Sequence, residues 1–496
     1  MKRTMRKESL MVMIFVATLL FLAFSLSLSG ITAEKKSLKL EPGTEINIFC
    51  DGGINVVPFD MVRSEIEKLT GIKINVNPVA QVDVYTKLKN EFVSGAGAFD
   101  LVVYPPKYEA EFANLGNIQP MDPYIGVYDP KLDDIPESLR ELYCMYNGKL
   151  YSLPYDGDLH IFYYRKDLIE DPMEQKNFKD KYGYDLDVPE TWDETINFAE
   201  FFTRKKGETL AGKTLEDDFF GHIMMLSRLW NIYEFIDRFA AYQGKYFDED
   251  LNAAINSEAG IKALDIIKEL LKYAPEESLS YGYFETRGSF LGGHSASMLQ
   301  FTDIFKFSYD ASQSAVQGKV GLSHIPGSIV DGKLYYKGTM PYGRCMSITS
   351  ATKHPAEAYW VAAYLSTRID FVFDPRTGED PFRYSHINSP DYLAEYLTKF
   401  SGGFEVPVDD CKNYLEAIGN SFASAYPEFS LPGSELYMDT LSLYIHKALT
   451  GEMTNKEALD QCAKKWDETS EALGREQQKE IWKGLLVSWK KLGLIE

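Results

Sequence analysis

Hydrophobic and polar positions near the start of the chain switch repeatedly between the period of a strand and the period of a helix. The predicted strands cover 45–50, 72–76 and 99–104, and the helices between them cover 59–69 and 85–92. Such alternation predicts parallel βαβ units, in which ligands bind beyond the carboxyl ends of the strands. Asp51 and Tyr104 follow or end two of these strands and are therefore candidate ligand contacts, and Gly52 and Gly53 would let a backbone approach closely.

The chain beyond residue 160 is mostly helical in pattern. Thr454 and Glu457 form a capping box that predicts the start of a helix. No Pro-, Gly- or Ser-rich linker divides the chain into consecutive domains, and no internal repeat is present. This organisation fits two lobes that share the chain through several crossings.

The first thirty residues have the order of a secretory signal. Four cations lie within residues 2–7, residues 10–28 are apolar apart from three hydroxyl residues, and Ser27 and Ser29 are small. We expect residues 1–29 to be a signal peptide, with cleavage as late as residue 33 or retention as a membrane anchor as alternatives. The first cysteine is Cys50, so a lipid-anchored lipoprotein is disfavoured. The predicted location is periplasmic or extracellular.

Composition narrows the class of protein. Of the 496 residues 45% are hydrophobic and 25% charged, which is typical of globular proteins, and the net charge is −21. An acidic chain repels phosphate backbones, so we expect no nucleic-acid partner. Five cysteines without a CxxC spacing exclude the usual zinc and thioredoxin motifs, and their odd number leaves at least one thiol unpaired. They are Cys50, Cys144, Cys345, Cys411 and Cys462.

Catalytic motifs are poorly supported. Residues 207–214 (GETLAGKT) match the phosphate-loop pattern, but a helical pattern precedes them and acidic residues follow, so a surface turn is expected. Residues 293–297 (GHSAS) lack the last glycine of a nucleophile elbow. No cofactor is predicted, and Asp374, Glu379 and Asp380 are spaced too irregularly to assign a calcium site. A carboxylate pair of a glycoside hydrolase remains open.

Several segments, taken together and in order, carry a family resemblance. They are 99–103 (FDLVV), 116–122 (GNIQPMD), 148–154 (GKLYSLP), 162–168 (FYYRKDL), 189–194 (PETWDE), 319–326 (KVGLSHIP), 354–360 (HPAEAYW) and 451–458 (GEMTNKEA). This chain resembles the family-1 extracellular solute-binding proteins of bacterial ABC importers. Arg165 departs from the family's usual Asn, and residues 374–386 resemble an insertion.

The resemblance implies an α/β, two-lobed, periplasmic-binding-protein-like fold of type II, with a ligand cleft between lobes that close by a hinge motion. Lobe I would comprise 43–156 and 301–343, and lobe II would comprise 157–300 and 344–496. Asp158 aligns with an acidic ligand contact of sugar-binding members, and Trp230 lies where the family places a stacking aromatic. The other contacts that the crossings imply are Tyr155, Asp156, Gln300, Asp303, Tyr342 and Arg344. Trp192 is expected to be structural, and Arg383 is expected in a surface ion pair.

The function that this resemblance implies is capture of a sugar, oligosaccharide or polyol and its delivery to an ABC importer. The protein would act as a monomer and catalyse no reaction. Two alternatives remain open: a secreted glycoside hydrolase, and a ligand-binding subunit that reports to a membrane sensor.

Overall fold

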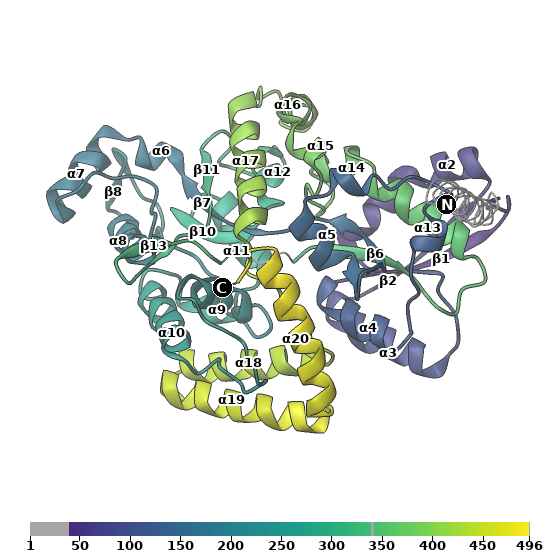
Figure 1. Cartoon of the computed structure of the whole chain (residues 1–496). Helices are drawn as coiled ribbons and strands as arrows, with labels where there is room; N and C mark the ends of the chain where they lie inside the picture. The colour runs from purple at the N-terminus through teal and green to yellow at the C-terminus, as the bar shows by residue number, and fades with distance from the viewer. Residues whose placement is uncertain (1–38, 339–341, 496) are drawn as a thin grey trace, which may run out of the picture. The chain divides into compact units, whose positions relative to one another are not determined.

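The computed structural model describes residues 39–338 and 342–495 (Figure 1). The predicted signal peptide, residues 1–29, lies outside the described residues. Leu40–Glu496 forms one compact unit. Within the described ranges, no helix combines the length and the apolar character that a membrane crossing requires.

A five-stranded mixed sheet contains the predicted βαβ units. Its strand order is β2-β1-β3-β14-β6, in which β1 pairs in parallel with β2 and β3, and β14 pairs antiparallel with β3 and β6. The strands are β1 (Glu45–Asp51), β2 (Lys73–Val79), β3 (Leu101–Tyr104), β6 (Ser152–Asp156) and β14 (Arg344–Ile348). The connecting helices are α2 (Val57–Thr70) and α3 (Val84–Ser94), and α13 (Pro355–Ser366) packs against β14, β6 and β3. The prediction of parallel units at the start of the chain is confirmed.

A second, antiparallel sheet has the order β10-β7-β11. Its strands are β7 (His160–Arg165), β10 (Ser297–Phe301) and β11 (Val320–Ser323). The two sheets lie in different regions of the unit (Figure 1), and the fold is α/β and two-lobed, as predicted. Around the second sheet the chain is mainly helical, with α8 (Trp192–Phe202), α9 (Asn231–Ala241), α10 (Glu258–Leu271) and α11 (Tyr283–Leu291).

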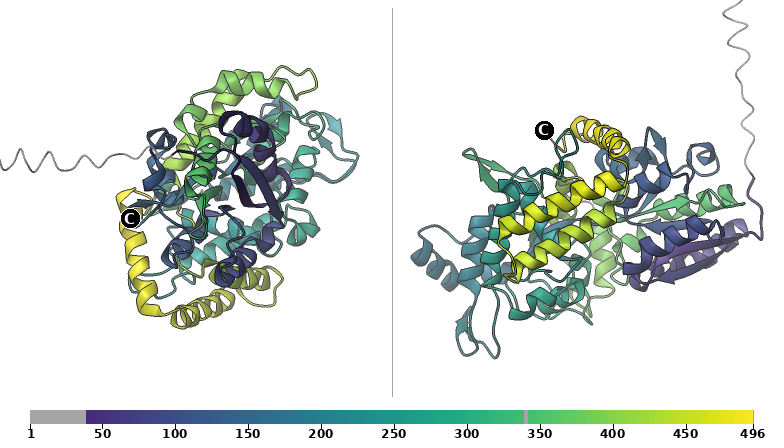
Figure 2. Two further views of the ribbon diagram at one scale, coloured as in Figure 1. Left: turned by 90° about the vertical axis from the view of Figure 1, so that its right-hand side faces the viewer. Right: turned by 90° about the horizontal axis from the view of Figure 1, so that it is seen from below.

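The C-terminal part is also helical. Its longer helices are α16 (Pro390–Thr398), α17 (Val408–Ser424), α18 (Ser434–Leu449), α19 (Asn455–Ala472) and α20 (Arg475–Lys491). Helices α18 and α19 run side by side, and both contact α10 (Figure 2). Thr454 Oγ1 accepts the backbone N–H of Glu457 at the start of α19, and the Thr454 N–H donates to the Glu457 carboxylate, so the predicted capping box is present.

The chain crosses from the first sheet to the second within three residues. Strand β6 ends at Asp156 and β7 begins at His160. Gly157 is required here, because a Cβ at this position would lie 2.3 Å from the carbonyl oxygen of Pro381. The crossing therefore packs tightly against residues 380–382, part of the segment that resembles an insertion.

The strand pairing differs from the predicted division into lobes in two segments. Strand β11, within 301–343, pairs with β7 of the second sheet, and β14, within 344–496, pairs with two strands of the first. The sheet to which each of these strands belongs is determined by hydrogen bonds to strands far away in the sequence. The local pattern of hydrophobic and polar residues does not predict such pairings.

The phosphate-loop-like segment is a turn. It forms a two-stranded hairpin, β8 (Thr209–Leu210) and β9 (Lys213–Thr214), with positive φ angles at Ala211 and Gly212. No helix follows the motif directly, so its backbone amides do not form a phosphate cradle. The prediction of a surface turn is confirmed.

Candidate ligand-binding site

A cavity of about 500 Å³ lies where segments of both sheets come together. Its lining comprises Asp51, Gly52, Gly53, Ile54, Asn55, Val79, Ala80, Gln81, Pro105, Asp158, Trp230, Tyr233, Tyr283, Phe284, Phe301, Asp303, Tyr342, Arg344, Gly378 and Glu428. Six of the ten predicted site residues belong to it: Asp51, Asp158, Trp230, Asp303, Tyr342 and Arg344.

The parallel strands of the first sheet contribute one side of this cavity through their carboxyl ends. Asp51 is the last residue of β1, Val79 is the last residue of β2, and Pro105 directly follows β3. Gly53 lies in the left-handed region, with φ 75°, where a side chain would be strained. This cavity therefore lies at the edge of the sheet where the switch-point rule for parallel sheets predicts a ligand.

Aromatic rings form another side of the cavity. Trp230 directly precedes α9 and stacks on Tyr283 at 6.3 Å between ring centroids. Tyr233, one turn along α9, meets the ring of Tyr342 edge-on at 4.3 Å. Phe301, the last residue of β10, contacts all four of these rings. Such faces cover the C–H surfaces of a ligand.

Arg344 joins the ends of three strands. Its Nη2 lies 2.8 Å from Asp51 Oδ2, and its Nη1 lies 2.9 Å from Asp156 Oδ2. The Nε atom also donates to the Asp51 carboxylate. The Arg344 side chain is 13% exposed, so its charge is largely balanced by these two carboxylates before any ligand binds.

Two further carboxyl groups of the lining have raised pKa values. Asp158 Oδ1 accepts hydrogen bonds from the backbone N–H and the hydroxyl of Thr302. Burial, together with the nearby Asp156, raises the pKa of Asp158 well above its usual range. Burial also raises the pKa of Asp303 to about 6, although the Tyr283 hydroxyl donates to Asp303 Oδ2.

Tyr104 and Gln300 were expected in the site, and the structure places both in the interior instead. The Tyr104 hydroxyl shares a hydrogen bond of 2.7 Å with Ser347 Oγ, on the neighbouring strand. The Gln300 amide donates to Thr286 Oγ1 at 2.7 Å. Neither residue lines the cavity, because successive side chains of a strand point to opposite faces.

Tyr155 and Asp156 do not line the cavity either. Tyr155 is fully buried, and its hydroxyl donates to the carbonyl oxygen of Asn55 at 2.7 Å. Asp156 is fully buried as the partner of Arg344 and accepts the backbone N–H of Asp380. Both residues therefore contact lining residues, Asn55 and Arg344, without lining the cavity themselves.

Arg383 was expected in a surface ion pair, and this expectation is wrong. The residue is 1% exposed, and its guanidinium donates to the carbonyl oxygens of Ser366 and Pro130. Its nearest carboxylate, Asp134, is 3.7 Å away. Trp192, expected to be structural, is fully buried with the Arg238 guanidinium 4.1 Å from its ring centroid.

Several lining residues were not predicted, notably Tyr233, Tyr283, Phe301 and Glu428. Tyr233 lies three residues after Trp230, and this helical spacing would have indicated a shared face. Glu428 comes from the segment between α17 and α18, where no motif marks it. Burial raises the pKa of Glu428 to about 8.

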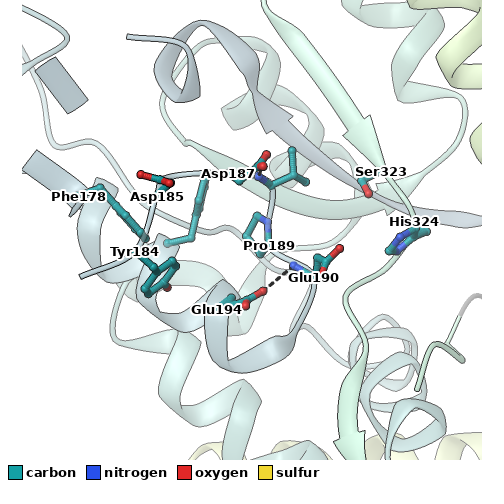
Figure 3. A pocket seen from close by; sticks show the side chains of 11 residues that line it. Phe178, Tyr184, Asp185, Asp187, Pro189, Glu190, Glu194, Ser323 and His324 are labelled. Carbon is teal, nitrogen blue, oxygen red and sulfur yellow. Dashed lines mark hydrogen bonds between the residues drawn. The ribbon is translucent and has the colours of Figure 1, made fainter. Parts of the chain in front are cut away.

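A second pocket, of about 450 Å³, lies near the start of α8 (Figure 3). Two of its carboxylates already have structural partners, since Asp185 pairs with Lys179 at 2.7 Å and Glu194 accepts the N–H of Glu190. None of the predicted site residues lines it.

Across residues 39–338 and 342–495, no group of three or more His, Cys, Asp or Glu side chains is arranged to hold a metal ion.

Comparisons with known proteins identify relatives of this chain. The family described as bacterial extracellular solute-binding protein matches residues 60–368. A probable amino-acid ABC transporter periplasmic-binding protein from Sinorhizobium fredii is 26% identical over 388 residues, which cover 77% of this chain and 82% of that protein. The mannitol-binding protein of Pseudomonas aeruginosa is 26% identical over 49% of this chain and 52% of its own length.

Solved structures are similar in fold. The crystal structure of an ABC transporter solute-binding protein from Agrobacterium radiobacter, in complex with ribitol, has a TM-score of 0.69 at 20% identity. The similarity covers 87% of this chain and all of the other.

Proposed function

We propose that this chain, which belongs to the family of bacterial extracellular solute-binding proteins, captures a sugar or polyol outside the cytoplasm and delivers it to an ABC importer. The observation that carries the proposal is the composition of the cavity: one side of aromatic rings and another of carboxyl groups at strand ends. Aromatic faces cover the C–H surfaces of a carbohydrate, while carboxyl oxygens accept hydrogen bonds from its hydroxyls.

The charges around the cavity favour a carbohydrate over an amino acid, the ligand class in the name of the Sinorhizobium relative. An amino acid brings a carboxylate that needs a cation. Among the described residues that line the cavity, Arg344 is the only cation, and Asp51 and Asp156 already balance it. A ligand carboxylate would instead face Asp158 and Asp303. The names of the mannitol-binding relative and the ribitol complex agree with this preference.

Catalysis is the weaker alternative. A glycoside hydrolase needs two carboxyl groups flanking one bond, and Asp158, Asp303 and Glu428 line the cavity. The family and the relatives that match this chain, however, are described as binding proteins. Incubation of the purified protein with oligosaccharides tests this, because steady release of reducing ends would reveal a hydrolase. A sensor subunit would share the same cavity, and a knockout that loses a transcriptional response while retaining solute uptake would identify that role.

A thermal-shift screen tests the proposal directly. Mannitol, ribitol, hexoses, oligosaccharides and amino acids are added separately to the purified protein. A ligand at about 100 times its dissociation constant stabilises the folded state by about 2.7 kcal/mol. We expect a carbohydrate to raise the melting temperature; a shift given only by amino acids would contradict the proposal.

Two variants connect that shift to the cavity. Trp230→Ala removes a ring that faces it and should weaken binding about tenfold, equivalent to about 1.4 kcal/mol. Asp158→Asn should also weaken binding, because it removes an acceptor oxygen. Tyr384→Ala is the matched aromatic control, since Tyr384 is exposed and does not line this cavity. Equal affinity of Trp230→Ala and Tyr384→Ala would exclude the aromatic side as a contact.

A further inference from the structure

Acidic side chains outnumber basic ones in the lining of the cavity. Asp158, Asp303 and Glu428 face it, while the cation Arg344 is already paired with Asp51 and with a carboxylate behind the lining. Burial raises the pKa values of all three carboxyl groups, and a positively charged ligand would stabilise their ionised form. The acidic lining therefore bears on which carbohydrate the cavity selects.

Two of these carboxyl groups carry an oxygen without a hydrogen-bond partner among the described residues. Asp303 Oδ1 and Glu428 Oε2 are both buried and unpaired, and the two residues are only 3% and 9% exposed. Buried acceptors are almost always satisfied in native proteins, because an unpaired one costs roughly 1–3 kcal/mol. Both residues line the cavity, so a ligand that brings donors would satisfy them.

The neighbouring cations of the protein are engaged elsewhere. Lys107, near Glu428, lies 3.4 Å from a carboxylate oxygen of Glu435. Lys306, near Asp303, donates to the carbonyl oxygens of Thr377 and Glu379. Arg287 donates its hydrogen bond to the Tyr283 hydroxyl, which in turn donates to Asp303. None of these three cations lines the cavity.

The aromatic side of the same cavity is also suited to a cation. Trp230, Tyr233 and Tyr283 all line it, and the faces of such rings attract ammonium groups. We propose that the cavity selects a carbohydrate that carries a protonated amine, an amino sugar or amino polyol, whose ammonium group pairs with the carboxylate of Asp303 or with that of Glu428. This inference rests on the proposed function, capture of a sugar or polyol, and specifies that this ligand carries a positive charge.

Matched pairs of probes test the inference by isothermal titration calorimetry. The pairs are D-sorbitol with 1-amino-1-deoxy-D-sorbitol, and D-glucose with D-glucosamine, and N-acetyl-D-glucosamine serves as the uncharged derivative. We expect at least one amine to bind tenfold or more tightly than its neutral partner. A neutral member that binds as tightly as the amine in both pairs, or no binding by either amine, overturns the inference.

The variant Asp303→Asn/Glu428→Gln retains the shape of both side chains and removes their charge. It should bind the two members of a pair with similar affinity, and an undiminished preference for the amine would overturn the assignment of these residues. The control Asp187→Asn/Glu190→Gln removes two exposed acidic groups that do not line this cavity (Figure 3) and should keep the preference.

The dependence of affinity on pH gives an independent measurement. Burial raises the pKa of Asp303 to about 6 and that of Glu428 to about 8. The titratable and charged groups around Asp303 are Tyr283, Lys306, Arg287, Asp156, Asp158, Asp380, Tyr163 and Tyr414. Those around Glu428 are Lys107, Glu435, Tyr143, Tyr233, Tyr246 and Tyr342. Since only the ionised carboxylate pairs with an ammonium group, the affinity for aminodeoxysorbitol should rise from pH 5.5 to 8.5, beyond any change for sorbitol. Parallel curves would overturn the inference.

The design separates the two proposals. If neutral carbohydrates stabilise the protein and amines are not preferred, the inference fails and the proposed function stands. If no carbohydrate of the wider screen, charged or neutral, stabilises the protein, the proposed function itself fails.

Discussion

Replacing Glu109 with Gln should make the protein more stable at alkaline pH. Glu109 begins α4 (Glu109–Asn114) and is 4% exposed, with the Ser152 hydroxyl donating to its Oε2. Burial raises the pKa of Glu109 from the ordinary 4.5 to about 8, in spite of that hydrogen bond. The folded protein therefore retains a proton that the unfolded chain has already lost.

The sign and size of the effect follow from this difference. Between pH 4.5 and 8 the folded state binds more protons than the unfolded state, so the free energy of unfolding falls as pH rises. The span from 4.5 to about 8, at about 1.4 kcal/mol per pH unit, gives a loss of about 5 kcal/mol. Glu109→Gln removes this titration, and its amide resembles the neutral carboxyl group in shape.

Urea unfolding followed by tryptophan fluorescence, at pH 5.0, 6.5 and 8.5, measures the effect. We expect wild type and Glu109→Gln to have similar stability at pH 5.0, and the variant to be more stable by several kcal/mol at pH 8.5. The control is Glu111→Gln, on the same helix, which breaks an ion pair with Lys89 of 3.0 Å and should lower stability without this gain. A constant difference between wild type and Glu109→Gln over the whole range would refute the reasoning.

Three further predictions concern other buried groups. Arg344→Met removes the cation that pairs with the carboxylates of Asp51 and Asp156 and should cost about 3–5 kcal/mol in urea unfolding. Arg344→Met/Asp51→Asn should recover part of the loss, and no recovery would contradict the ion-pair account. Tyr104→Phe should lower stability by about 1 kcal/mol and leave ligand affinity unchanged, because its hydroxyl faces the interior; weakened binding would place it in the site. All five cysteines are free and buried, so a thiol reagent followed by mass spectrometry should label them only in denaturant, and labelling of the folded protein would contradict their burial.

The pattern of residues predicts local structure well. The strands expected at 45–50, 72–76 and 99–104 correspond to β1, β2 and β3, because period and turn residues act over a few positions. The position of β14 could not be derived in this way. It pairs with β3 and β6, whose residues lie about 190–250 positions earlier in the chain.

The same distinction applies to the site. Resemblance places candidates at the crossings, but it does not tell which face of a strand a side chain occupies. On β10, Gln300 points to the interior and Phe301 to the cavity, one residue later. The position of Glu428 in the lining could not be predicted from the sequence, because only the folding of the chain between α17 and α18 brings this residue to the cavity.

The arrangement of the cavity also bears on how binding would change the protein. Asp51 ends a strand of the first sheet, whereas Trp230 belongs to the helices around the second. If the lobes close by the hinge motion that the family resemblance implies, a ligand that contacts both residues gains more free energy in the closed form and shifts the population toward it. The size of that shift equals the difference between the ligand's affinities for the two forms. A ligand that contacts only the aromatic side would have nearly the same affinity for both forms, so it would bind without closing the lobes. With such a hinge, contacts at the strand ends, rather than affinity alone, would decide which solutes close the protein.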